Sequence, residues 1–145
     1  MPPTEPTPEA LRNPLLRYLL ATRPAFLSAT LCGWLIGIGT AHHAGVALDT
    51  GLAGLTLLFA LVAHAGVNVL NDYYDARIGT DAINEGRIFP FTGGSRFIQN
   101  GVLGESETGR YGAALFATVM AAGLLLVARS GPATISISSF RVSWP

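Results

Sequence analysis

Five polar side chains in one apolar stretch are spaced so that they share a single helical face. They are His64, Asn68, Asn71, Asp72 and Asp75. At about 100° per residue, all five fall within an arc of roughly 100°. A polar stripe at membrane depth is costly, so it must face a partner, water or a ligand. Carboxylate and amide oxygens on one face suit Mg²⁺, which takes one or two protein carboxylates and completes its octahedron with water and phosphate oxygens.

Cationic and glycine residues follow the stripe. Arg87 and Arg96 can bind phosphate in bidentate fashion. Between them, Gly93 and Gly94 allow backbone amides to approach an anion closely. Asp81 lies beyond Gly79 and joins the acidic set if the chain bends there. This pattern predicts a site for an amphiphile with a diphosphate head and an apolar tail; the alternative is an Asp–Arg network that only closes a helix bundle.

The elements that must position these residues are long uncharged runs. Residues 24–48, 50–71 and 111–128 contain no charged side chain. Each run reaches the roughly 17 to 25 apolar residues that cross a bilayer as a helix. We therefore expect an all-α, polytopic membrane protein with three transmembrane helices, at about 25–44, 50–75 and 108–128. The alternative is that one run, most plausibly the shortest, is a buried core helix of a soluble protein.

Composition excludes several other classes of function. Only 12% of the residues are charged, and nine basic and nine acidic residues give a net charge of zero. No basic surface is therefore expected to hold nucleic acid. The single cysteine, Cys32, excludes an intramolecular disulfide framework and a cysteine-based zinc site.

The distribution of arginine predicts an orientation. Arg12, Arg17 and Arg23 precede the first run, whereas residues 42–49 contain no arginine. Under the positive-inside rule, the N-terminus and a site loop over residues 72–110 are cytoplasmic, in what we expect to be a bacterial inner (cell) membrane. Residues 1–24 are expected to form a cytoplasmic tail that becomes an interfacial helix at about 14–22.

Residues 71–81 read NDYYDARIGTD. This segment resembles the first aspartate-rich motif of the UbiA family of membrane prenyltransferases, NDxxDxxxD. It is closest to the branch that prenylates 1,4-dihydroxy-2-naphthoate in menaquinone biosynthesis, where the pattern is NDxxDxxxGxD. Residues 93–96, GGSR, and 98–101, IQNG, are also similar to that branch. The resemblance extends over about residues 17–128.

The resemblance implies a partial UbiA-type helical bundle that transfers a polyprenyl group from an allylic polyprenyl diphosphate to an aromatic acceptor, with Mg²⁺ as cofactor. The implied metal ligands are Asn71, Asp72, Asp75 and Asp81. The implied catalytic residues are Asp72, Asp75, Arg87 and Arg96. The two aspartates and Arg87 would help the diphosphate to leave, and Arg96 would bind either the diphosphate or the acidic group of the acceptor. The implied substrate-binding residues are Asn68, Asn71, Tyr74, Arg77, Gly93, Gly94 and Ser95. The oligomeric state stays open.

Residues 129–145 are unlike the family, and the chain has no second aspartate-rich motif on a further span. We therefore expect an incomplete copy of the domain, produced by truncation or a frameshift. The alternatives are a non-catalytic membrane fragment, a prenyltransferase for another acceptor such as 4-hydroxybenzoate, and a small transporter or structural membrane protein. Within the stripe, His64 is either a hydrogen-bonding residue of the bundle or part of the acceptor site.

Overall fold

The fold is all-helical over the residues that the computed structural model describes. These are residues 5–80, 86, 88–89 and 94–130, with side chains to residue 125. A short helix α1 (Pro14–Ala21) and a 3₁₀ helix η1 (Pro24–Leu27) precede three long helices: α2 (Ser28–His43), α3 (Thr50–Ile78) and α5 (Glu105–Ser130).

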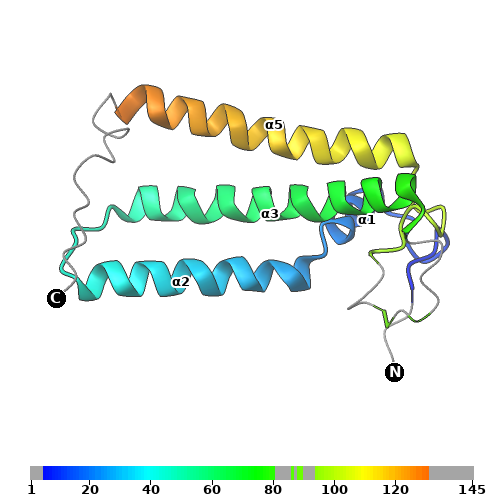
Figure 1. Ribbon diagram of the computed structural model, residues 1–145, viewed down its shortest axis with the longest axis horizontal. Coiled ribbons are helices and arrows are strands. Elements are labelled where there is room, and N and C mark those ends of the chain that lie inside the picture. The colour runs from blue at the N-terminus through cyan, green and yellow to red at the C-terminus, as the bar shows by residue number, and fades with distance from the viewer. Residues whose placement is uncertain (1–4, 81–85, 87, 90–93, 131–145) are drawn as a thin grey trace.

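The three long helices lie side by side in one layer, with α3 between α2 and α5 (Figure 1). The connection from α2 to α3 is at one end of the layer. At the other end, α1 and the residues that precede α5 gather where α3 ends and α5 begins (Figure 1). The predicted site residues of α3 lie at this second end, which we call the site end.

Local chemistry explains where α3 and α5 begin and end. Asp49 caps the start of α3, because its Oδ1 accepts the Leu52 N–H at 3.0 Å. The helix runs to Ile78, three residues beyond the predicted end, and stops at Gly79, whose φ of 84° is in the left-handed region. Helix α5 begins at Glu105, and Glu107 accepts the Gly104 N–H at 3.2 Å, as in a capping box.

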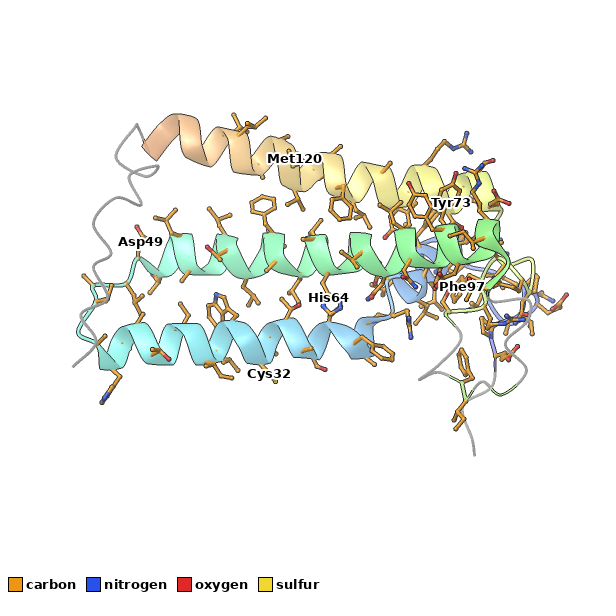
Figure 2. The ribbon with its side chains drawn as sticks, viewed as in Figure 1. Cys32, Asp49, His64, Tyr73, Phe97 and Met120 are labelled. Atoms are coloured by element: carbon orange, nitrogen blue, oxygen red, sulfur yellow. The ribbon has the colours of Figure 1, made fainter. Side chains whose placement is uncertain are left out.

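Glycines bring α3 and α5 into close contact. A Cβ atom at Gly112 would lie 2.6 Å from Leu70 Cδ2, and one at Gly109 would lie 2.9 Å from Tyr73 Cε2. Tyr73 accordingly lies between the two helices (Figure 2). Small residues allow helix backbones to approach closely where no hydrophobic effect drives association, as in lipid.

Helices α2 and α3 are joined differently, by polar contacts. Thr30 Oγ1 and His64 Nδ1 are 2.7 Å apart, and Trp34 Nε1 donates to the Ala53 carbonyl at 3.0 Å. His64 lies between the two helices, whereas Cys32 is on the side of α2 that faces away from α3 (Figure 2). The interpretation of His64 as a hydrogen-bonding residue of the bundle agrees with this contact.

Among the described residues, the hydrophobic core is confined to the site end. It consists of Leu11, Ala21, Val69, Phe97, Val102 and Leu103. Along the rest of the layer, large apolar side chains are exposed: Ile36 of α2 is 70% exposed, and Leu124 of α5 is 67% exposed. The core helix of a soluble protein would be mostly buried, which these helices are not.

Two helical segments are long and apolar enough to cross a membrane, Pro24–His43 and Thr50–Ile78. None of the residues in the most apolar window of the first segment is buried. The third predicted span lies in α5, which is not one of these two, and its final side chains fall outside the described residues. The described fold is thus all-helical with two candidate membrane-spanning helices.

Candidate functional site

The outward-facing part of the aspartate motif is a pair of oxygen-bearing side chains. Asn71 Nδ2 donates to Asp75 Oδ2 at 2.6 Å, one turn along α3. Asn71 is exposed and Asp75 is half-buried, so both are accessible from outside the helix layer. The bond places the Asn71 amide nitrogen against the carboxylate and holds the two side chains on one face of α3. Carboxylate and amide oxygens are ligand types that suit Mg²⁺.

Asp72 has a different environment, although it lies between these two residues in sequence. Its side chain is on the buried side of the last turns of α3, and only 4% of the residue is exposed. Its carboxylate accepts the backbone N–H of Ser95, at 3.1 Å to Oδ1 and 3.3 Å to Oδ2. This contact places Ser95, one of the predicted substrate-binding residues, beside the aspartate motif.

The chain around Ser95 adopts an unusual backbone conformation. Gly94 has φ of 71° and Arg96 has φ of 64°, so left-handed residues stand on both sides of Ser95. The next residue, Phe97, is buried in the core at the site end (Figure 2). This arrangement holds Gly94, Ser95 and the half-buried Arg96 beside the end of α3.

Asn68 contacts another part of the chain. Its Nδ2 donates to the carbonyl of Thr22 at 2.8 Å, between α1 and η1. Asn68 thus helps to fix the start of η1 and α2 against α3. The predicted polar stripe is divided among several contacts, and among its members Asn71 and Asp75 form the outward-facing pair.

Arg77 and Tyr74 lie away from that pair. Arg77 Nη1 donates to Tyr73 Oη at 2.9 Å, and Arg77 Nε is 3.6 Å from Glu105 Oε1 at the start of α5. Two residues along a helix correspond to about 200°, which places Arg77 on nearly the opposite side of α3 from Asp75. Tyr74 is exposed and stacks edge-to-face on Tyr73, with ring centroids 5.0 Å apart.

Three predicted site residues, Asp81, Arg87 and Gly93, lie outside the described residues. Among the residues that are described, no group of three or more His, Cys, Asp or Glu side chains is arranged to hold a metal ion. Within the described part of the motif, the side chains of Asn71 and Asp75 are hydrogen-bonded to each other through the Asn71 amide nitrogen.

Sequence reasoning missed an apolar pocket at the site end. It has a volume of about 330 Å³ and lies between the N-terminal segment, η1 and residues 94–97. Its walls are mainly aliphatic and aromatic side chains, among them Leu11, Leu20, Phe26, Phe89 and Phe97. Arg23 lines it and lies over the Phe26 ring, 4.3 Å from the centroid. Arg23 and Pro24 are adjacent in sequence, but the other side of the pocket is formed by residues 89 and 94–97. Local spacing does not relate residues that are more than 60 positions apart.

Sequence reasoning also missed a contact between α1 and α5. Tyr18 Oη donates to Glu107 Oε1, and the rings of Tyr18 and Tyr111 are edge-to-face with centroids 4.9 Å apart. The hydrogen bond to Glu107 raises the pKa of Tyr18. The same bond, with the Gly104 N–H, lowers the pKa of Glu107. This contact holds α1 against the start of α5.

Comparison of the chain with protein-family models, with curated proteins and with solved structures found no match in any of the three.

Proposed function

We propose that this chain carries the diphosphate-binding site of a Mg²⁺-dependent membrane prenyltransferase. The proposed reaction transfers a polyprenyl group from an allylic polyprenyl diphosphate to an aromatic acceptor, 1,4-dihydroxy-2-naphthoate. The observation that carries the proposal is the NDYYDARIGTD segment, in which Asn71 and Asp75 form an accessible pair at the end of an apolar helix. The GGSR segment, which resembles the same family branch, contacts that helix turn through Ser95.

The residues have separable tasks in this proposal. Asn71 and Asp75 would hold Mg²⁺, and the resemblance adds Asp72 and Asp81. The ion, when bound, would supply positive charge to the departing diphosphate. Arg96 would neutralise or bind phosphate oxygens, and the backbone at Gly94 would contribute N–H donors to them. Arg87 is assigned the same task by the resemblance. The apolar helices would exclude water from the allylic cation until the acceptor ring attacks it.

The proposed location is the membrane, with the site end on the cytoplasmic side. The two candidate spans support the location, and the arginine distribution supports the orientation. Helix α1 is suited to the membrane–water interface, because Leu15 is 79% exposed and Leu19 is 57% exposed on a helix that contains Arg17.

The binding test uses the full chain in lipid nanodiscs, with Mn²⁺ as a paramagnetic substitute for Mg²⁺ and farnesyl diphosphate as the ligand. We expect Mn²⁺ to bind in the presence of farnesyl diphosphate, and Asp75→Ala to weaken this binding on the order of tenfold or more. The matched control is Asp49→Asn, which removes a carboxylate from the other end of the same helix but retains a good N-cap residue. Equal affinity in wild type and Asp75→Ala would contradict the assignment of the metal site.

The reaction test adds 1,4-dihydroxy-2-naphthoate or 4-hydroxybenzoate to the same sample. We expect prenylated naphthoate, identified by mass spectrometry, and no prenylated benzoate. Prenylation of the benzoate alone would assign the chain to the other acceptor class. Diphosphate binding without any product would favour the second candidate, a non-catalytic membrane protein that binds Mg²⁺ and diphosphate.

A further inference from the structure

We propose that Asp72 positions the segment 94–96 against α3 and does not itself bind the metal. This assignment differs from the role that the family resemblance implies for Asp72. The claim that Asp72 does not bind the metal rests on the proposed function. The claim that Asp72 positions residues 94–96 rests on contacts within the chain.

The first observation is the position of the carboxylate. Asp72 is 4% exposed, and both of its oxygens lie within hydrogen-bond distance of one backbone N–H, that of Ser95. A carboxylate that binds Mg²⁺ must present an oxygen to an ion that also holds water and phosphate. Asn71 and Asp75 meet that requirement because they are accessible, whereas Asp72 would have to leave its contact with Ser95.

The second observation is the backbone that Asp72 holds. Ser95 stands between two residues in the left-handed region, Gly94 and Arg96. A side chain with a Cβ atom, as at Arg96, adopts this region only when its surroundings compensate for the strain. A charged acceptor at the intervening N–H provides such compensation, because hydrogen bonds to an ionised group are stronger than neutral ones.

The third observation is that the residues after Ser95 pack on the same part of α3. Phe97, Val102 and Leu103 are buried in the core that contains Val69, three residues before Asp72. Asn100 then ties this segment to the N-terminal residues, because its Nδ2 donates to the Pro6 carbonyl at 2.9 Å. Asp72 thus adds a carboxylate acceptor to the mainly apolar contact between the described residues 94–103 and α3.

The consequence is that Asp72 and Asp75 of the motif have different roles. Asp75 faces outward with Asn71, where a cation can reach it. Asp72 faces inward and sets where Arg96 and the adjacent backbone stand relative to that pair. In this proposal Asp72 is a positioning residue, and its loss changes the site through residues 94–96.

The experiment compares Asp72→Ala, Asp72→Asn and Asp75→Ala, with Asp49→Asn as the control, in the full chain in nanodiscs. Hydrogen–deuterium exchange of the peptide that spans residues 94–103 is measured without ligand. We expect Asp72→Ala to raise its exchange by about tenfold to a hundredfold, as loss of a hydrogen bond to a charged group does. Asp72→Asn retains an acceptor oxygen, so we expect a smaller rise, of a few-fold. We expect Asp75→Ala and Asp49→Asn to leave this peptide unchanged.

Mn²⁺ affinity in the presence of inorganic diphosphate is measured on the same variants. We expect Asp72→Asn to stay within about twofold of wild type and Asp75→Ala to lose about tenfold or more. An Asp72→Asn protein that keeps its exchange protection but loses Mn²⁺ affinity as Asp75→Ala does would overturn the proposal. Unchanged exchange of residues 94–103 in Asp72→Ala would overturn it equally.

The two proposals fail in different ways. If wild type does not bind Mn²⁺ with diphosphate, the proposed function fails, while the exchange measurement still decides whether Asp72 anchors residues 94–103. If Asp72→Ala does not fold, the exchange of residues 94–103 in Asp72→Asn decides whether Asp72 holds this segment against α3. The absence of the few-fold rise in exchange would contradict that role.

Discussion

At the scale of single residues, the polar side chains of α3 each stabilise a different neighbour. His64 contacts Thr30 of α2, Asn68 holds the carbonyl of Thr22, and Asp72 holds the N–H of Ser95. Among the described contacts of the stripe, the one between Asn71 and Asp75 lies wholly within the motif. Most of the stripe therefore positions chain segments around the one accessible pair.

A first prediction concerns the contact between Thr30 and His64. Thr30→Val removes the hydroxyl while keeping a similar shape, so we expect it to lower the free energy of unfolding by about 0.6 to 1.7 kcal/mol, as for interhelical hydrogen bonds in membranes. Unfolding in mixed detergent micelles measures this. Thr40→Val is the control, because the Thr40 hydroxyl bonds only to Ile36 of its own helix in the described contacts. A double variant with His64→Ala that is strictly additive would contradict the contact.

The partners of these residues could not be predicted from the sequence, although their common face could. Helical periodicity places His64, Asn68 and Asp75 on one side of α3 without reference to the rest of the chain. The partner of Asn68 is a backbone carbonyl 46 residues away, and that of Asp72 is an N–H 23 residues away. Backbone groups have no sequence signature, so only the fold reveals which of them a side chain reaches.

At the scale of elements, α3 and α5 pack more closely than α3 and α2. Glycines at 109 and 112 admit the side chains of Tyr73 and Leu70. The sequence predicted these helices, because an uncharged run is a local property. It did not predict which glycines face a neighbour: Gly33, Gly37 and Gly123 have nothing within 4 Å of an added Cβ atom.

A second prediction follows for Gly112. Gly112→Ala places a Cβ atom 2.6 Å from Leu70 Cδ2 and 3.3 Å from the Leu70 backbone nitrogen, so the Leu70 side chain and the helix backbones must shift. We expect a loss of about 1 to 3 kcal/mol in the free energy of unfolding. Gly123→Ala on the same helix has open space and should be neutral or slightly stabilising. Equal effects of the two substitutions in a detergent unfolding titration would refute this packing.

A third prediction concerns pH and the position of α1. The largest cause of the lowered pKa of Glu107 is its hydrogen bond with the Tyr18 hydroxyl. The stability from this bond is therefore present above the ordinary glutamate pKa of about 4.3, and it is lost as pH falls through the lowered pKa. The pKa of Tyr18 is raised, so the same stability is present below about pH 10 and is lost as pH rises through the raised value. Arg17 and Arg110, which also act on Glu107, keep their charge throughout this range.

The measurement is a distance between spin labels at Arg12→Cys and Ser106→Cys, in a background with Cys32→Ser. We expect the distribution to broaden at both pH extremes. Tyr18→Phe keeps the ring that faces Tyr111 but removes the hydroxyl, so it should broaden the distribution at neutral pH and abolish the pH dependence. A distribution that is narrow and independent of pH in Tyr18→Phe would contradict the role of this bond.

At the scale of the whole molecule, one layer of helices leaves extensive apolar surface uncovered. Leu35 and Ile36 of α2 and Met120 and Leu124 of α5 are all exposed. The charge-free runs in the sequence predicted apolar helices of this kind. The number of helices that cross the membrane also depends on neighbouring helices and lipid, which the runs do not specify. The described structure has two candidate spans where the sequence predicts three; the third predicted span lies in α5, whose final side chains fall outside the described residues.

A fourth prediction tests membrane insertion and orientation together. In a Cys32→Ser background, we introduce Val46→Cys between α2 and α3 or Ser106→Cys at the site end; both native residues are exposed. In intact cells, an impermeant maleimide should label the Val46→Cys protein, and label the Ser106→Cys protein only after the membrane is opened. Labelling of both proteins in intact cells, or the reverse pattern, would contradict the proposed orientation.

The two kinds of helix contact imply an order of assembly. Helices α2 and α3 are separated by only six residues, 44–49, and their contacts include hydrogen bonds that become stronger away from water. They can therefore form a hairpin as they enter the membrane. The described contacts between α5 and α3 are packing at Gly109 and Gly112 and one exposed ion pair, Arg77–Glu105. The packing needs the side chains of Leu70 and Tyr73 already in place. We expect α5 to dock last, and its docking brings Glu107 to Tyr18 and so closes the site end around the motif.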